Sequence, residues 1–233
     1  MDQQEMKAMT GKGAVDRLVT SGMKLGLGTG STAIHVVRHI GMLMKEGKLK
    51  NILAVPTSFQ PLIACEEWGI PIYTLNSKEI GGQLDLTIDG ADEVEGAHYC
   101  VKGGGGALLL EKIVAYASRS YAIVVDETKI VKNLGLCFPV PLEVIPEARI
   151  SVIREAERLG AEGTLREAVR KAGPVITEHG NLLLDIRFKH PIDPVALERD
   201  LNQIPGVVEN GFFTRLRPTV FIGHTDGTLE IRE

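Results

Sequence analysis

The sequence predicts an α/β fold, in which a mostly parallel sheet carries helices on both faces. Two observations support this prediction. Apolar strand patterns alternate with helical patterns through residues 1–134, and glycine-rich turns follow several strands, as at 28–30 and 103–106. Because Rossmann-like sheets of this kind bind ligands beyond the carboxyl ends of their strands, these turns are the first candidates for a site.

The elements of the sheet follow one another from the N-terminus. The apolar spacing predicts helices at 7–20, 33–44, 59–68 and 107–117. Strands are expected at 24–27, 51–55, 72–75, 84–88 and 121–125. The last of these helices is apolar all round, which indicates that it is buried.

The pattern changes beyond residue 134, where a small α+β, ferredoxin-like unit is predicted. Its elements are a strand at 140–144, a helix at 148–159, a hairpin of 174–178 with 182–188, and a helix at 193–203. Strands at 207–213, 220–222 and 228–231 are expected to return to the first unit. We therefore predict an α/β domain of 1–134 with 206–233, and an inserted α+β domain of 135–205.

The composition excludes several classes of protein. Of 233 residues, 44% are hydrophobic and 24% are charged, as in ordinary globular proteins. The net charge of −4, without a basic run, disfavours a nucleic-acid partner. No membrane-spanning run, signal peptide or transit peptide is recognisable. The three cysteines give no disulfide framework or zinc spacing: Cys65, Cys100 and Cys137. We therefore expect a soluble, cytoplasmic protein without membrane partners.

The first glycine-rich turn is typical of a phosphate cradle. A strand runs into Gly28, Thr29, Gly30, Ser31 and Thr32, and a helix follows. Such a turn aims backbone N–H groups at an anion, while the Ser and Thr hydroxyls add donors and can cap the helix. The spacing fits neither a dinucleotide fingerprint nor a Walker A loop, which disfavours NAD and ATP. A plain tight turn remains the alternative.

Two carboxylates, Asp89 and Asp92, follow directly after the strand at 84–88. In this position they can perform acid/base work, orient sugar hydroxyls or bind a metal. The alternative is a solvated acidic turn in which Asp92 caps a helix. Glu93 and Glu95 are interpreted as solvated.

The segment from Lys102 to Glu111 combines a cation, four glycines and a carboxylate. Gly103 to Gly106 leave backbone N–H groups bare at the N-terminus of a helix, an arrangement that binds anions. Lys129 also follows a strand. The alternative is a glycine-rich surface turn with solvated Lys and Glu side chains.

The histidines indicate no metal centre. His35 and His39 are four residues apart on one predicted helix, but no third ligand lies near them in the sequence. His179, His190 and His224 belong to no constellation. We therefore expect no bound metal.

Two motifs occur together at a highly specific spacing, Asp89-Gly90-Ala91-Asp92 and Lys102-Gly103-Gly104-Gly105 followed by Glu111. In this combination the chain resembles ribose-5-phosphate isomerases of the A type over its whole length. The resemblance implies interconversion of D-ribose 5-phosphate and D-ribulose 5-phosphate in the non-oxidative pentose phosphate pathway, without cofactor or metal. It also implies a homodimer or a dimer of dimers.

The resemblance also implies roles for single residues. Glu111 is expected to carry a proton between C2 and C1. Asp89 and Lys102 are expected to assist ring opening and hold the reacting oxygens, and Asp92 to orient hydroxyls. Lys7 corresponds to a lysine that approaches the phosphate. The implied substrate-binding positions are Thr29, Gly30, Ser31, Thr32, Asp89, Gly90, Ala91, Asp92, Lys102, Gly103, Gly104, Gly105 and Lys129.

Two other functions remain open from the sequence. A CoA transferase of the same fold uses a glutamate as a nucleophile, and a glutamate thioester trapped by hydride would reveal it. A non-catalytic sugar-phosphate sensor needs a DNA-binding unit, but only about two dozen residues precede the first strand.

Overall fold

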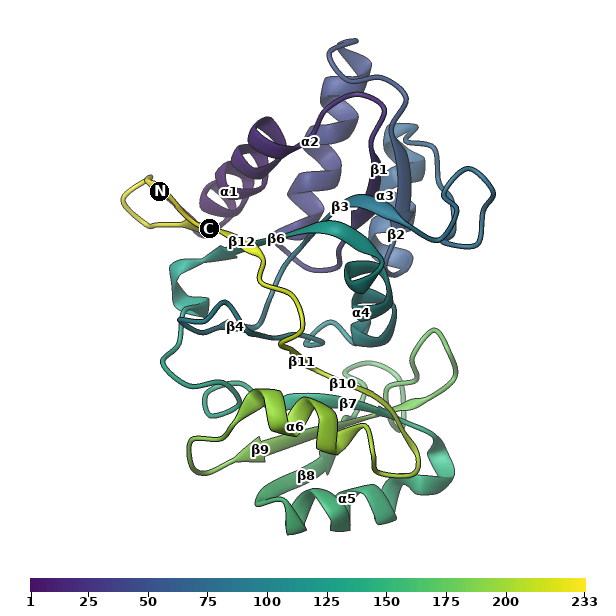
Figure 1. Ribbon diagram of the computed structural model, residues 1–233, viewed down its shortest axis with the longest axis vertical. Helices are drawn as coiled ribbons and strands as arrows, with labels where there is room; N and C mark the ends of the chain where they lie inside the picture. The colour runs from purple at the N-terminus through teal and green to yellow at the C-terminus, as the bar shows by residue number, and fades with distance from the viewer. The chain divides into compact units, whose positions relative to one another are not determined.

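The computed structural model describes residues 1–233, which form two compact units (Figure 1). The first unit comprises Met1–Ala91, Leu110–Lys129 and Arg217–Glu233, and the second comprises Asp92–Leu109 and Ile130–Leu216. The second unit therefore extends beyond the expected 135–205. The additional residues include a small sheet that has no clear signal in the sequence.

The first unit is built on a six-stranded sheet of order β13-β12-β6-β3-β1-β2. All neighbouring strands are parallel except β12 and β13, which are antiparallel. The strands are β1 (Lys24–Leu27), β2 (Leu53–Pro56), β3 (Leu84–Asp89), β6 (Ser118–Asp126), β12 (Thr219–Gly223) and β13 (Leu229–Arg232).

The strand expected at 72–75 does not form. Only Ile72 makes an isolated parallel bridge, to Ala54. The Thr74 N–H donates to the Ser77 hydroxyl at 3.0 Å. Because this N–H is used within a local turn, the chain leaves the sheet here.

Helices cover both faces of this sheet, as predicted. Leu25 and Leu27 of β1 pack into a core shared with α1, α2 and α3. Gly26, between them, faces α4, where a Cβ would lie 2.5 Å from Val114 Cγ1. Because successive strand residues point to opposite faces, α4 lies on the face opposite to α1, α2 and α3. The helices are α1 (Gln3–Leu18), α2 (Ala33–Lys45), α3 (Phe59–Trp68) and α4 (Leu108–Tyr116).

The first helix begins earlier than the expected residue 7. Asp2 accepts the Glu5 N–H at 2.8 Å, and Glu5 accepts the Asp2 N–H at 3.0 Å. This reciprocal capping box satisfies two backbone donors at the helix start and extends the helix by one turn. None of the helices combines the length and apolar character that a membrane crossing requires.

The second unit contains a four-stranded antiparallel sheet of order β10-β7-β9-β8. Its βαββαβ chain order is the ferredoxin-like order. Both helices contribute to the core beneath the sheet, through Val152 and Ala156 of α5 and Leu197 and Leu201 of α6. The elements are β7 (Val140–Val144), η2 (Pro146–Ala148), α5 (Arg149–Arg158), β8 (Ala161–Leu165), β9 (Leu182–Phe188), α6 (Pro194–Leu201) and β10 (Val207–Asn210).

The hairpin predicted between 174–178 and 182–188 forms only beside its turn, where the Thr177 N–H donates to the Asn181 carbonyl at 3.0 Å. Strand β9 pairs with β8, and from the expected first arm only Ile176 makes an isolated bridge, to Leu182. Strand β8 was missed because its sequence, with Glu162 and Gly163, lacks the apolar alternation of a buried strand.

A three-stranded sheet of order β11-β5-β4 completes the second unit. Its strands are β4 (Glu93–Val94), β5 (Cys100–Val101) and β11 (Phe212–Phe213). The single strand expected at 207–213 is therefore divided into β10 and β11, and neither returns to the first unit. Gly211 lies close to β5, since a Cβ there would stand 2.5 Å from the Lys102 carbonyl oxygen.

Candidate active site

In the first unit, the candidate residues lie along one edge of the sheet. Strands β2, β1, β3 and β6 are parallel neighbours, so their carboxyl ends reach the same edge. The turns that follow carry Thr57 and Ser58, the loop 28–32, Asp89 and Lys129 in that spatial order. Ligands of parallel sheets bind at this edge.

Asp89 organises the first glycine-rich loop. This carboxylate is buried at the end of β3, and its Oδ1 accepts the Thr29 N–H at 3.0 Å and the Gly90 N–H at 2.7 Å. Gly28 makes the approach possible, because a Cβ there would lie 1.9 Å from the same Oδ1. The glycine therefore serves close packing of loop and carboxylate.

Hydroxyl groups from the next strand end support the same loop. The Thr29 hydroxyl bonds to the hydroxyls of Thr57 at 2.8 Å and Ser58 at 2.6 Å. The Gly30 N–H donates to Gln60 Oε1 at 2.8 Å. Thr57 and Ser58 follow directly after a predicted strand, a signal from which their role could have been found, whereas Gln60 lies in α3.

Lys7 contributes a cation to the loop from α1. Its side chain is largely buried, and its Nζ donates to the Ser31 hydroxyl at 2.9 Å. Thr32 is the N-cap residue of α2, but its side chain makes no capping hydrogen bond. The predicted side-chain cap is therefore wrong.

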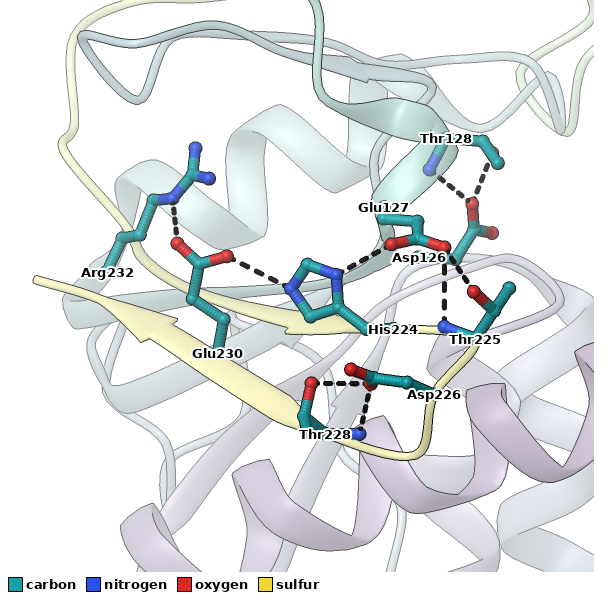
Figure 2. Close-up of polar contacts among 9 residues, drawn as sticks. All are labelled: Asp126, Glu127, Thr128, His224, Thr225, Asp226, Thr228, Glu230 and Arg232. Atoms are coloured by element: carbon teal, nitrogen blue, oxygen red, sulfur yellow. Dashed lines mark hydrogen bonds and ion pairs between the residues drawn. The ribbon is translucent and has the colours of Figure 1, made fainter. Parts of the chain in front are cut away.

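Lys129 lies in a single 3₁₀ turn, η1 (Glu127–Lys129), directly after β6. Asp126 accepts the Thr128 N–H at 3.1 Å and is also bonded to the Thr128 hydroxyl (Figure 2). Glu127 Oε1 accepts the Thr225 hydroxyl at 2.9 Å and the Thr225 N–H at 3.3 Å. The turn that carries Lys129 is thus tied to the turn between β12 and β13.

His224 belongs to a constellation, contrary to the sequence interpretation. Its Nδ1 lies 2.7 Å from Glu127 Oε2, and its Nε2 lies 3.0 Å from Glu230 Oε2. Figure 2 shows the ring between the two carboxylates. The partners are 97 and 6 residues away, a relation that no local pattern reveals.

Glu111 lies in the first turn of α4 and is 3% exposed. Its neighbours Leu110 and Val114 pack against the sheet in a small core. The helix is only partly buried, contrary to the sequence prediction, because Ile113 is 46% exposed. The Glu111 carboxylate lies on its buried side, close to the positive end of the helix dipole.

In the second unit, Asp92 and Lys102 flank a pair of short strands. Strands β4 and β5 pair with Glu93 opposite Val101, so Asp92 and Lys102 are the next opposing positions. The Asp92 N–H donates to the Val101 carbonyl at 2.9 Å. The Lys102 side chain is 2% exposed, and its Nζ lies 5.4 Å from the centroid of the Phe213 ring, a cation–π distance.

The second glycine-rich loop wraps around Asp92. Gly103 has φ +105°, which favours glycine. Asp92 Oδ2 accepts the Gly104 N–H at 2.7 Å, and a Cβ on Gly104 would lie 2.4 Å from Asp92 Oδ1. The Gly106 N–H donates to the Gly103 carbonyl at 2.9 Å. Two of the four amides predicted to be bare therefore donate within the protein.

Arg166 fixes the carbonyl side of this loop. Its Nη1 donates to the Gly103 oxygen at 3.0 Å and the Gly104 oxygen at 3.1 Å. Its Nε donates to Asp185 Oδ2 at 2.8 Å, and Nη2 bonds to the other oxygen of that carboxylate. This bidentate pair uses the fixed fork geometry of the guanidinium.

Residues 53–227 match the model of the family described as ribose 5-phosphate isomerase A (phosphoriboisomerase A). The chain belongs to this family. A relative from Treponema denticola named ribose-5-phosphate isomerase A is 51% identical over 99% of this chain and 99% of its own length. Another of that name, from Thermosynechococcus vestitus, is 46% identical over 98% of this chain and 96% of its own. The resemblance found in the sequence is thereby confirmed.

Solved structures support the same family assignment. The structure of ribose 5-phosphate isomerase A from Methanocaldococcus jannaschii has a TM-score of 0.92 and 41% identity, and the match covers 100% of each chain. A D-ribose-5-phosphate isomerase in complex with phospho-erythronic acid gives 0.94 and 38%, with the same coverage. The predicted α/β fold is confirmed by this likeness.

The acidic turn of this family member departs from one sequence prediction. Glu93, interpreted as solvated, is 1% exposed. Its carboxylate accepts the N–H groups of Gly135 at 2.6 Å, Phe138 at 2.6 Å and Cys137 at 3.1 Å. Glu93 thus anchors the segment that precedes β7, and its role is structural.

The histidine pair of α2 has a simple environment. His39 Nε2 lies 2.7 Å from Asp16 Oδ1, and His35 is not part of that contact. No group of three or more His, Cys, Asp or Glu side chains in the chain is arranged to hold a metal ion.

Proposed function

We propose that this chain interconverts D-ribose 5-phosphate and D-ribulose 5-phosphate, with Glu111 as the base that moves the proton. The observation that supports this most is the buried carboxylate of Glu111 on the helix that follows the Lys102 glycine loop, in a member of the ribose 5-phosphate isomerase A family. The reaction belongs to the non-oxidative pentose phosphate pathway of the cytoplasm, and the active form is a homodimer or a dimer of dimers.

Phosphate binding is assigned to the edge of the first unit. Lys7, Ser31, Thr32 and Lys129 supply cations and hydroxyls, and Thr29 and Gly30 supply the backbone of the loop. Lys7 already donates to the Ser31 hydroxyl at 2.9 Å. Fixing the phosphate, which does not react, holds the sugar so that proton transfer becomes effectively intramolecular.

Ring opening and orientation are assigned to the two aspartates and Lys102. The substrate is a cyclic sugar whose ring closes through O4, because O5 carries the phosphate, so its C1–O4 bond must break before isomerisation. Asp89 and Lys102 hold and exchange the protons of the oxygens concerned, while Asp92 orients hydroxyls, together with Gly90, Ala91 and the loop 103–105. Asp92 is half-buried and already bonded to Gly104, which supports a positioning role.

The proton transfer itself needs one base that reaches two adjacent carbons. In the open-chain aldose, Glu111 takes the proton from C2, and the electron pair forms an enediolate with charge on O1. Glu111 then returns the proton to C1, and the proton of the C2 hydroxyl passes to O1, which yields the ketose. The Lys102 ammonium stabilises the enediolate charge, an effect worth a few kcal/mol for a fixed donor.

No cofactor or metal is part of the proposal, since Lys102 supplies the positive charge that the enediolate requires. The test is exhaustive dialysis of the purified protein against EDTA, followed by a ribose 5-phosphate assay in metal-free buffer. We expect full activity. Lost activity that a divalent ion restores would contradict the proposal and make Asp89 and Asp92 candidate ligands. Phospho-erythronic acid is expected to bind, and calorimetric titration would measure it without turnover.

A further inference from the structure

His224 has a hydrogen-bonding requirement that only its charged form satisfies. Both ring nitrogens face carboxylate oxygens, Glu127 Oε2 at 2.7 Å and Glu230 Oε2 at 3.0 Å (Figure 2). An ionised carboxylate only accepts, and a neutral imidazole has a single N–H. A neutral ring would therefore turn a lone pair toward one of the two carboxylates, whereas an imidazolium donates to both.

The other charged groups around the ring are few and engaged. From β13, Arg232 Nε donates to the second oxygen of Glu230 at 2.7 Å. In the turn between β12 and β13, Asp226 bonds within its own turn. The N-terminal amino group of Met1 donates to the Thr225 carbonyl at 3.4 Å. The two carboxylates in direct contact therefore dominate the surroundings of the ring.

The titration behaviour agrees with this geometry. Hydrogen bonds with Glu127, and then with Glu230, raise the pKa of His224 above its ordinary 6.5. The bond with His224 is the main cause that lowers the pKa of Glu127 below 4.5. The pKa of Glu230 is lowered mainly by Arg232 and then by His224. All these groups are partly exposed, so solvent screening limits the energy of the contact.

The contact acts on the turn that carries Lys129. Glu127 and Lys129 are the first and last residues of the three-residue turn η1. One Glu127 oxygen is held by Thr225, and the other is held by His224. Loss of the His224 bond leaves η1 attached to the β12–β13 turn through one carboxylate oxygen only.

We propose that His224 is a positioning residue for the Lys129 turn, an imidazolium clamp that joins Glu127 to Glu230 and holds Lys129 toward the substrate phosphate. This inference rests on the proposed function, because the substrate phosphate is assigned to Lys129. The clamp is closed below pH 6.5 and opens as the pH rises through the raised pKa of His224. On the acid side it persists until the pH falls through the lowered pKa values of the two glutamates, below 4.5.

The test measures kcat and KM for ribose 5-phosphate from about pH 6 to about pH 9 in the full chain, with each variant compared with wild type at every pH. The substrate phosphate titrates equally in all samples and cancels in these ratios. Relative to Glu230→Gln, we expect the wild-type KM to rise roughly threefold to fivefold toward alkaline pH while kcat changes little, since a binding group is displaced.

Two variants are expected to change the clamp in opposite ways: His224→Gln opens it at every pH, and Glu230→Gln keeps it closed at alkaline pH. His224→Gln cannot donate to both carboxylates, so KM should already be high near neutral pH and should lack the alkaline rise. In Glu230→Gln the introduced amide donates to the Nε2 lone pair, so a neutral ring keeps its Nδ1–H for Glu127. KM should then stay low across the range. His190→Gln, at an exposed histidine of the second unit, is the matched control and should follow wild type.

An independent readout follows the ring directly. The imidazole NMR signal of His224, assigned by its loss in His224→Gln, should titrate above 6.5 in wild type and at lower pH in Glu230→Gln. An equal alkaline rise of KM in wild type and Glu230→Gln, or a wild-type KM profile in His224→Gln, would overturn the inference. A wild-type chain without isomerase activity would instead refute the proposed function, and the inference with it.

Discussion

The two units hold their candidate site residues by different means. In the first unit the groups follow parallel strands, and bonds between adjacent strand ends, such as Asp89 to Thr29, fix the turns. In the second unit Asp92 and Lys102 flank two-residue antiparallel strands. Their glycine loop is fixed from a distance by Arg166, 63 residues beyond Gly103.

This difference shows which parts of a site depend on topology and which depend on single contacts. Parallel strands bring their carboxyl ends to one edge of the sheet, and this does not depend on which side chains the following turns carry. A short loop outside such a sheet has no equivalent support, so the partly buried ion pair of Arg166 and Asp185 provides it. We therefore expect the second unit to be sensitive at a position that carries no motif.

The largest effect is expected at Glu111, the only group assigned to proton transfer between the two carbons. Glu111→Gln keeps the shape of the side chain and removes the base, so kcat should fall by about 10²–10⁴-fold with little change in substrate binding. Steady-state assays and calorimetric binding of phospho-erythronic acid measure the two quantities. Glu46→Gln, at the exposed end of α2, is the control. Turnover within a few-fold of wild type would remove Glu111 from the mechanism.

Gly28→Ala and Gly104→Ala compare the units directly. At Gly28 a Cβ would lie 2.5 Å from the Asp89 Cα, whereas at Gly104 the close atoms belong to the Asp92 carboxylate alone. The backbone at Asp89 cannot move away from an added methyl group as easily as the Asp92 side chain can. We expect Gly28→Ala to lower kcat/KM by more than ~10²-fold and to lower Tm, and Gly104→Ala to cost less.

Gly96→Ala should leave both activity and Tm unchanged, because nothing lies within 4 Å of its Cβ. Equal losses at Gly28 and Gly104 would show that the two loops are supported with the same rigidity.

The sequence predicted the two-part organisation of the fold and the motif positions at strand ends, because strand periodicity and glycine turns are local signals. It missed β8 and the short strands β4 and β5, and it joined β10 and β11 into one strand, because these elements depend on pairing with distant segments. The burial of Glu93 and the partners of His224 were missed for the same reason. Each depends on a contact 42 or 97 residues away.

Arg166, which belongs to no sequence motif, tests whether the glycine loop of the second unit depends on a single distant contact. Arg166→Met leaves Asp185 without its bidentate partner and frees two loop carbonyls, so we expect about a tenfold loss of kcat/KM and about 2 kcal/mol lower stability. Arg166→Lys should remain impaired, because an ammonium cannot reproduce the fork. Arg158→Met, at an exposed pair with Glu155, is the control. Wild-type activity in Arg166→Met would show that the loop needs no distant support.

Smaller effects are expected from the phosphate-binding residues of the first unit. Lys129→Ala should raise KM about tenfold, and Thr32→Val should raise it less, because each loses one contact to a charged group. Since both contacts serve ground state and transition state alike, kcat should change little. A collapse of kcat at constant KM would place these residues with the chemistry.

The central claim, proton transfer by Glu111 through an enediolate, is tested most directly by hydrogen exchange. Ribose 5-phosphate is incubated with EDTA-treated enzyme in D₂O, and proton NMR follows deuterium at C1 of the ketose and C2 of the aldose. We predict ribulose 5-phosphate with deuterium at C1, and formation of product and label slowed by about 10²–10⁴-fold with Glu111→Gln. Unchanged conversion and labelling by Glu111→Gln would contradict the account.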